Sequence, residues 1–333
     1  MIKKFSELKK PFIIAEIGNN HEGSFSNAVK LIDLAAWAGA TAVKFQTYKV
    51  ENYINPIQDK RYKRLTKFQL TFEEFKKLKL HANKKKLYFI STPLDLDSAN
   101  FLKKNSDYLK IASGDNNYFD LIESVLKSKK PLIISSAFAD IKLLDRVIKL
   151  VKSKKDKNFY LKKFALLQCT GSYPTKHQDV NLKVISSLKK RYRCNIGFSD
   201  HTTDNVASIS ATSFGAMIFE KHFTLDNNFS SFIDHKVSLA PKAFKKYVED
   251  VENAYLSLGN KNKRILKCEK EFLINNRRTL VLKKNISKNS MIYNKDLIAL
   301  RPELKKQKNN IIHKDKSTIR MVSKQNYKKF DPY

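Results

Sequence analysis

Residues 195–222 decide the fold that we predict for this chain. The stretch reads N-I-G-F-S-D-H-T-T (Asn195 to Thr203), continues with an amphipathic run over 204–214, and ends with G-A-M-I-F-E-K-H (Gly215 to His222). An apolar strand, a helix and a second apolar strand in this order require the two strands to lie parallel. The stretch therefore predicts one strand–helix–strand unit of an α/β protein.

A histidine stands at the carboxyl end of each predicted strand, His201 after the first and His222 at the end of the second. Neighbouring parallel strands lie roughly 5 Å apart. Two imidazoles at equivalent heights on such strands suit a divalent transition metal. The pattern gives the hypothesis that His201 and His222 hold one metal ion.

The same alternation of apolar strands and amphipathic helices runs through most of the chain. The predicted strands are 12–16, 42–46, 87–91, 108–112, 132–136, 164–169, 195–198 and 216–221. The predicted helices are 26–38, 71–84, 97–104, 118–127, 141–152, 181–190, 205–214 and 241–258. Eight consecutive units without a dinucleotide-binding fingerprint favour a closed (β/α)8 barrel, the TIM-barrel fold, over a doubly wound sheet.

The character of the sequence changes after Gly259, which is placed to cap the last barrel helix. We predict a catalytic barrel over residues 1–262, a charged linker over 263–276 and a small β-rich domain over 277–333. The last segment contains no glycine, so its turns depend on Asn, Lys and Asp.

Composition limits the classes of function. The net charge is +33, from 65 Lys and Arg against 32 Asp and Glu, and a strongly basic surface can bind polyphosphate. The lysines are spread along nearly every helix, and the chain has no aromatic-interleaved basic tract or zinc-finger spacing. We expect a solvated surface and no nucleic-acid partner, with a nucleic-acid binder as the remaining alternative.

The cysteines and the apolar runs indicate the compartment. Cys169, Cys194 and Cys268 are odd in number, widely spaced and without a C-x-x-C pair, which is typical of reduced thiols in the cytoplasm. No stretch approaches about 18 consecutive apolar residues. We expect a cytoplasmic protein with no membrane partner.

Polar side chains collect where the predicted strands end, and the carboxyl ends of the strands carry the active site of a TIM barrel. These side chains are Glu22, Lys44, Gln46, Thr92, Lys110, Ser113, Asp115, Ser135, Tyr173, Ser199, His201 and His222. Lysines with several hydroxyl donors suit a phosphate, and two imidazoles suit a metal. The set suggests a phosphorylated anion beside a metal that polarises a carbonyl.

Simpler explanations exist for the same residues. A single histidine at a strand end is more often structural than a ligand. Lys44 suits a core lysine paired with Glu16, although burying a charge for structure alone is costly. Serines and threonines at strand ends commonly cap the helix that follows. The residues by themselves leave these alternatives open.

Eight motifs in order make the chain resemble the sialic acid synthase family, which includes the N-acetylneuraminate, legionaminate and pseudaminate synthases. The motifs are I-A-E-I-G-N-N-H-E-G (14–23), A-G-A-T-A-V-K-F-Q-T (38–47), I-S-T-P (90–93), Y-L-K-I-A-S-G-D (108–115), C-T-G-S-Y-P (169–174), G-F-S-D-H-T (197–202), F-E-K-H-F-T (219–224) and D-H-K-V-S-L (234–239). They cover the predicted barrel from end to end.

The resemblance implies a reaction. The family condenses phosphoenolpyruvate with the open-chain aldehyde of an N-acetylmannosamine-type sugar, and gives a nine-carbon 2-keto sugar acid and phosphate. It also implies that His201 and His222 hold a divalent cation, Mn²⁺ first, with Mg²⁺ or Co²⁺ as alternatives. A barrel that binds sugar and anion without turnover is the alternative function.

The resemblance assigns roles to the other residues. Phosphoenolpyruvate is expected against Lys44, Thr92, Lys110, Ser113, Ser135 and Ser199. The sugar is expected against Gln46, Asp115, Tyr173 and Asp234, and Glu22 is the predicted proton-handling residue. The motif around Asp234 favours a neuraminate- or legionaminate-type sugar over a pseudaminate-type one, and it does not identify the sugar.

The resemblance extends to an antifreeze-like (SAF, β-clip) carboxyl-terminal domain, which in the family reaches over the partner's barrel in a domain-swapped homodimer. Arg301 matches the arginine that this domain gives to the N-acetyl group of the sugar. Two departures stand out: Glu303 replaces a usual glycine, and S-S-A-F-A (135–139) replaces S-T-G-M-A after the fifth strand.

Overall fold

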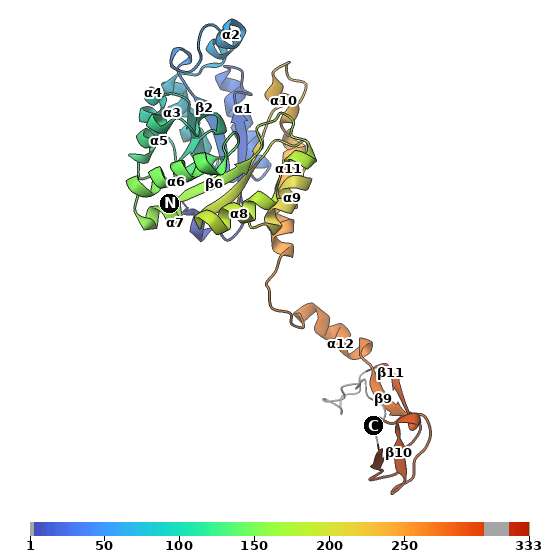
Figure 1. Cartoon of the computed structure of the whole chain (residues 1–333). Coiled ribbons are helices and arrows are strands. Elements are labelled where there is room, and N and C mark those ends of the chain that lie inside the picture. The colour runs from blue at the N-terminus through green and yellow to red at the C-terminus, as the bar shows by residue number, and fades with distance from the viewer. Residues whose placement is uncertain (1–2, 303–319, 333) are drawn as a thin grey trace. The chain divides into compact units, whose positions relative to one another are not determined.

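The computed structural model describes residues 3–302 and 320–332. Contacts divide the chain into two units, Met1–Gly259 and Asn260–Tyr333, and each is described by itself. In the first unit, helices surround a ring of strands (Figure 1).

Eight parallel strands close the first unit into a barrel, in sequence order from β1 to β8, with β8 paired to β1. The strands are β1 Phe12–Gly18, β2 Ala42–Thr47, β3 Tyr88–Pro93, β4 Tyr108–Ile111, β5 Leu132–Ser135, β6 Phe164–Cys169, β7 Asn195–Asp200 and β8 Ile218–His222. Each agrees with a predicted strand to within about two residues, an ordinary uncertainty of element ends. The predicted (β/α)8 barrel is confirmed.

The helices of this unit include every predicted one. They are α1 Phe25–Trp37, α2 Asp59–Phe68, α3 Phe72–Lys84, α4 Leu96–Asn105, α5 Phe119–Leu126, α6 Ile141–Lys154, α7 Lys157–Lys163, α8 Lys183–Tyr192, α9 Val206–Ser213, α10 Ile233–Val237 and α11 Pro241–Ser257. Short 3-10 helices are η1 Phe5–Glu7, η2 Val50–Asn52, η3 Ser113–Asp115 and η4 His177–Asp179.

Aspartate caps explain where several helices begin. Asp95, Asp140 and Asp156 each accept a hydrogen bond from the backbone N–H three residues on, at the first turns of α4, α6 and α7. Such a cap satisfies an N–H that has no partner within the helix. At α3, Thr71 and Glu74 form a reciprocal capping box.

Three helices of the first unit were not predicted: α2, α7 and α10. Only Leu65 and Phe68 of α2 are buried, so this charged helix has too little apolar periodicity to be recognised. The five-residue α10 and the seven-residue α7 are shorter than the window over which helical periodicity can be read.

Strand periodicity divides the barrel interior into an apolar half and a polar half. Successive inward-facing positions of β1 are Phe12, Ile14 and Glu16, and those of β8 are Ile218, Glu220 and His222. Phe12, Ile14 and Ile218 belong to a buried apolar cluster that also contains Ala42, Ile90, Tyr108, Ile133, Ala165 and Leu167. The cluster fills the amino half of the interior, and the polar side chains lie in the carboxyl half.

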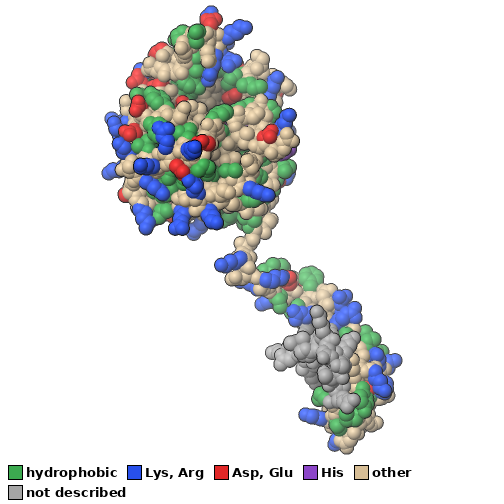
Figure 2. All heavy atoms as spheres, viewed as in Figure 1, with side chains coloured by type: hydrophobic (Ala, Val, Ile, Leu, Met, Phe, Trp, Pro, Cys, Tyr) green, Lys and Arg blue, Asp and Glu red, His purple; other side chains and the backbone are tan. Residues whose placement is uncertain are grey.

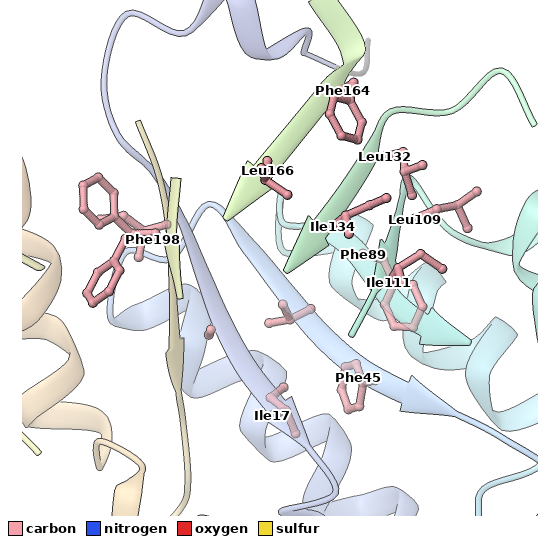
Figure 3. Packing of buried hydrophobic residues seen from close by; sticks show 14 of the residues in the cluster. Ile17, Phe45, Phe89, Leu109, Ile111, Leu132, Ile134, Phe164, Leu166 and Phe198 are labelled. Carbon is pink, nitrogen blue, oxygen red and sulfur yellow. The ribbon is translucent and has the colours of Figure 1, made fainter. Parts of the chain in front are cut away.

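A second, larger apolar cluster joins the outward faces of the strands to the helices. Figure 3 shows part of it, with Phe45, Phe89 and Ile134 beside the strands that carry them. Gly197 on β7 permits a close approach, since a Cβ there would lie 2.3 Å from the carbonyl oxygen of Ile218. Packing on both faces explains why the strands are apolar along most of their length.

The second unit contains two small antiparallel sheets. Its elements are η5 Lys267–Glu269, α12 Lys270–Asn276, β9 Thr279–Leu282, β10 Met291–Tyr293, η6 Asn294–Asp296, β11 Leu297–Leu300 and β12 Arg320–Val322. β9 pairs with β11 and β10 with β12. Leu282, Ile286, Ile292 and Leu297 form its core. The residues predicted as a linker include η5 and α12, and Glu303 lies outside the described residues.

The basic side chains are scattered over the surface. Figure 2 shows Lys and Arg on most parts of the visible face of the barrel, with fewer Asp and Glu between them. Within residues 3–302 and 320–332, no helix is both long and apolar enough to cross a membrane. The three cysteines are free.

A buried histidine makes the barrel sensitive to acid. The His21 side chain is 1% exposed, and its Nδ1 accepts a hydrogen bond of 3.0 Å from the N–H of Gly23. Burial lowers the pKa of His21 from 6.5 to about 4, against the weaker influence of Glu74. Between these pH values the unfolded chain binds a proton that the folded chain does not, so stability falls as the pH falls.

We predict that His21→Asn removes this loss, because the Asn side-chain oxygen can replace Nδ1 as the acceptor. The wild-type free energy of unfolding should fall by about 3 kcal/mol more than that of the variant between pH 6.5 and 4. Denaturant titrations at several pH values measure the difference, and the exposed His177→Asn is the control. Parallel pH profiles for wild type and His21→Asn would contradict the prediction.

Candidate active site

A cavity of about 130 Å³ lies in the carboxyl half of the barrel interior. All eight strands or the turns that follow them contribute side chains to it. Its polar and aromatic lining consists of Glu16, Lys44, Gln46, Thr92, Lys110, Ser113, Ser135, Phe138, Cys169, Tyr173, Ser199, His201, Glu220 and His222. The cavity therefore lies where a TIM barrel carries its active site.

Most of the predicted site residues meet in this cavity. They are Lys44, Gln46, Thr92, Lys110, Ser113, Ser135, Tyr173, Ser199, His201 and His222. Glu22, Asp115, Asp234 and Arg301 are not among its lining residues. Two lining carboxylates, Glu16 and Glu220, were not predicted as site residues.

Two lysines and two glutamates form a buried charge network in the cavity wall. Lys44 Nζ lies 3.2 Å from Glu16 Oε2 and 3.3 Å from Glu220 Oε2. Lys110 Nζ lies 3.5 Å from Glu220 Oε1 and donates to Ser135 Oγ at 2.6 Å. Each of the four charged side chains is at most 6% exposed.

The network separates the acidities of the two glutamates. Burial raises the pKa of Glu16 to about 7, and Lys44 only partly offsets this. Burial also acts to raise the pKa of Glu220, but Lys110 and Lys44 outweigh it and lower the pKa to about 2. Glu220 is therefore the fixed negative charge, and Glu16 can exchange a proton near neutral pH.

The pKa values of the two lysines are shifted in opposite directions. Burial acts to lower the pKa of Lys44, but Glu16 and Glu220 raise it. Burial lowers the pKa of Lys110 more than Glu220 can compensate. With Glu16 protonated, the network carries two cations against one anion, which favours binding of a small anion.

The two histidines lie side by side, as their strand positions predict. The register pairs Asp200 with Lys221, so that His201 is level with His222, and the ring centroids are 5.4 Å apart. His201 Nδ1 lies 2.8 Å from the carbonyl oxygen of Thr170. This bond places the proton on Nδ1 and leaves Nε2 as an acceptor, with the Tyr173 hydroxyl 3.1 Å away.

The donor set fits a metal with open coordination positions. Burial, followed by the effects of His201 and Lys44, lowers the pKa of His222 well below its usual value, so this ring stays neutral. Its Nδ1 has no hydrogen-bond partner among the described residues. In that part of the chain, no three His, Cys, Asp or Glu form a metal cluster. Burial acts to lower the pKa of His201, but Cys169 and the Thr170 carbonyl raise it. The two imidazoles would therefore bind an ion in competition with a proton on His201, and substrate and water would also coordinate that ion.

Asp115 and Asp234 are mostly buried acids outside the cavity lining. Burial raises the pKa of Asp115 to about 6, with Lys110 acting in the opposite direction. Burial also raises the pKa of Asp234 to about 6, and His201 is the larger of the two cations that oppose it. Both therefore lie within the electrostatic influence of the cavity, and their contacts with sugar stay predictions.

The Glu22 carboxylate faces the loop after β8. Glu22 has a backbone φ of 49°, accepts a hydrogen bond from Ser230 Oγ, and lies 3.2 Å from His235 Nε2. His235 Nδ1 lies 2.6 Å from Thr224 Oγ1. These contacts join the first loop of the barrel to α10, and the predicted proton-handling role of Glu22 stays a prediction.

The missed residues Glu16 and Glu220 had a signal in the sequence. Each lies two positions after an apolar residue that faces the barrel interior, and Glu220 lies two positions before His222. Side chains at such spacing share one face of a strand. Arg301 is exposed in the second unit, and its contact with sugar stays a prediction.

We predict that Lys44→Met lowers the free energy of unfolding by about 3–5 kcal/mol, because it leaves buried carboxylates without their cation. The loss should grow as the pH rises and Glu16 ionises. Lys49→Met is the control: its ion pair with Asp97 is 39% and 51% exposed, and solvent screening makes the contribution of such a pair to stability small. Denaturant unfolding measures both, and equal losses would contradict the prediction.

The sequence profile of the NeuB family matches residues 31–263. The N,N'-diacetyllegionaminic acid synthase of Campylobacter jejuni is 34% identical over 309 residues, 89% of this chain and 91% of that protein. The pseudaminic acid synthase of the same species is 33% identical over 317 residues, 90% of each protein. The two sequence identities are too similar to favour the legionaminic acid synthases over the pseudaminic acid synthases as relatives of this chain.

A solved structure agrees with the sequence relatives. The crystal structure of N-acetylneuraminic acid (sialic acid) synthetase from Leptospira borgpetersenii serovar Hardjo-bovis, in complex with citrate, aligns with a TM-score of 0.73 and 34% identity. The alignment covers 79% of this chain and 90% of that chain. Together with the match of the family profile, these similarities show that the chain belongs to the NeuB family.

Proposed function

We propose that this chain is a nonulosonic acid synthase. It condenses phosphoenolpyruvate with the open-chain aldehyde of an N-acetylmannosamine-type sugar, and releases a nine-carbon 2-keto sugar acid and phosphate. The observation that carries the proposal is one cavity in which the Lys44–Lys110 network borders the His201–His222 pair. The relatives named as legionaminic, pseudaminic and sialic acid synthases support it.

Phosphoenolpyruvate is proposed to occupy the cavity itself. The cavity volume of about 130 Å³ is small and suits a small anion. Lys44 and Lys110 supply positive charge, and hydroxyl groups of Thr92, Ser113, Ser135 and Ser199 supply hydrogen bonds. Lysine as a point charge among several hydroxyl donors is a common way to bind phosphate.

His201 and His222 are proposed to hold the divalent cation. Imidazole ligands favour a transition metal over Mg²⁺, and Mn²⁺ is proposed ahead of Co²⁺ on the family resemblance. When bound, the ion would polarise the aldehyde carbonyl. The neutral His222 ring and the Nε2 lone pair of His201 are the donors available for this role.

Glu16 is proposed to handle the proton. C3 of phosphoenolpyruvate forms the new bond to the aldehyde carbon. Water adds at C2, and one of its protons passes to the Glu16 carboxylate and from there to the aldehyde oxygen, which becomes a hydroxyl. The C2–O bond to phosphate then breaks, the second proton of the water leaves with phosphate, and C2 keeps the keto group. A pKa of about 7 suits such a base, and Glu220 keeps the lysines in place through the bonds described above.

The sugar is proposed to contact Gln46 and Tyr173 at the cavity, with Asp115 and Asp234 ordering the surrounding groups. The carboxyl-terminal segment, residues 277–333, is proposed to be a short antifreeze-like domain that follows a 1–262 barrel and a 263–276 linker. In a domain-swapped homodimer it would bring Arg301 to the partner's sugar. We also propose a cytoplasmic location, where phosphoenolpyruvate is available.

We predict that the purified protein releases phosphate from phosphoenolpyruvate only when an N-acetylated amino sugar and a divalent cation are both present. A chelator should abolish release, added Mn²⁺ should restore it, and His222→Ala should not be restored. The colorimetric phosphate assay measures this with N-acetylmannosamine and with its 2,4-diacetamido-2,4,6-trideoxy relative. Tight sugar binding without phosphate release would instead select the alternative of an inactive sugar-binding barrel.

We predict that Glu16→Gln lowers kcat by about 100-fold or more, the usual contribution of a general base. The wild-type rate should rise with pH through about 7 as Glu16 ionises, and Glu16→Gln should lose this dependence. Glu22→Gln is the matched comparison and should retain the pH profile. If Glu22→Gln removes the dependence and Glu16→Gln does not, then Glu22 is the base.

A further inference from the structure

Phe138 has an unusual backbone and an unusual exposure for a phenylalanine. It lies in the turn after β5, its φ is 61°, and 74% of the residue is exposed. Residues other than glycine rarely adopt a positive φ, and for a bulky residue this conformation is strained. Such strain persists only where the surroundings enforce it. The stretch 135–139, which the sequence singled out, therefore presents its aromatic ring at a conformational cost.

Neighbouring side chains hold the turn in this conformation. The N–H of Ala137 donates to Ser113 Oγ at 3.1 Å. Asn116 Nδ2 donates to the carbonyl oxygens of Ala137, at 2.8 Å, and of Ser135, at 3.3 Å. Asn116 is buried. The segment after β4 thus fixes the backbone immediately before the strained residue.

The ring of Phe138 lies against Gly171 and borders two spaces. A Cβ at Gly171 would fall 2.1 Å from Phe138 Cζ, so only glycine allows this contact. One space is the active cavity, and the other is a hollow of about 650 Å³. The walls of the hollow include the apolar side chains of Ile141, Leu144, Val184 and Leu188.

The size of the active cavity determines where the sugar must lie. The volume of about 130 Å³ is below the roughly 300 Å³ at which pockets for drug-sized ligands begin, so it suits phosphoenolpyruvate and leaves little space for a six-carbon amino sugar. The outer carbons of the sugar must extend to the rim. There the exposed aromatic side chains of the cavity lining are Tyr173, 40% exposed, and Phe138.

We propose that Phe138 is a specificity-determining residue for the acceptor sugar. It favours an N-acetylated sugar whose outer end carries methyl groups, as in a 6-deoxy diacetamido sugar, over one that carries hydroxyls there. A methyl group against the ring and the apolar hollow is removed from water favourably, whereas a hydroxyl would lose its hydrogen bonds to water. The inference rests on the proposed function.

The test compares two acceptors in wild type and Phe138→Ser. With 2,4-diacetamido-2,4,6-trideoxymannose, kcat/KM should fall about tenfold or more, the usual effect of losing one apolar contact in a pocket. With N-acetylmannosamine it should change less than about threefold, and KM for phosphoenolpyruvate should not change. Leu256→Ser, at a residue on α11 with a similar exposure of 71%, should leave all values unchanged.

A second variant separates specificity from folding. Phe138→Gly should melt at the same temperature as wild type or higher, since glycine adopts positive φ without strain, and should still lose the preference between the sugars. A lower melting temperature together with equal losses for both sugars would overturn the inference.

Failure of the proposed function gives a different result. In that case wild type releases phosphate with neither sugar, and saturation-transfer NMR of sugar binding decides the role of Phe138. Weaker transfer to the sugar methyl groups in Phe138→Ser supports the inference. Equal transfer in wild type and variant overturns it.

Discussion

The buried network of Lys44, Lys110, Glu16 and Glu220 is the constraint on which the site depends. Four charged side chains in a protein interior are tolerated only when each has a partner, because an unpaired buried charge is strongly destabilising. The closed barrel supplies those partners from β1, β2, β4 and β8 around one cavity. The apolar amino half of the interior supports this cavity from below. The strand register that closes the barrel therefore also brings the charged side chains of the site together.

The same network accounts for the anion binding and the proton transfer that we propose for this barrel. Glu220 stays ionised between two lysines, whereas burial raises the pKa of Glu16 to about 7. The cavity can thus change its charge by one proton without losing its pairing. His222 lies opposite Glu16 in the β1–β8 register, and His201 is level with His222, so that a cation between the two histidines would border the anion and leave the sugar to approach from the rim.

The strands and the histidine pair could be predicted from the sequence, because period-2 and period-3.6 patterns are local and the carboxyl ends of parallel strands meet. The family resemblance then supplied the reaction, which the spacing alone could not. Glu16 was missed because it was considered only as a structural partner of Lys44, although its inward position could be read from the strand. Glu22 was chosen for its place in a loop, and its contact with His235 depends on tertiary structure. The strain at Phe138 has no local signal.

We propose that the lysine pair makes the cavity an anion site, and titration calorimetry of phosphoenolpyruvate in the absence of sugar measures this binding. Wild type should bind at pH 7, and Lys110→Met should bind about 30-fold or more weakly, the loss expected for a buried charge contact. Lys149→Met, at a surface position of α6, should bind like wild type. Equal affinity of wild type and a folded Lys110→Met would contradict the account.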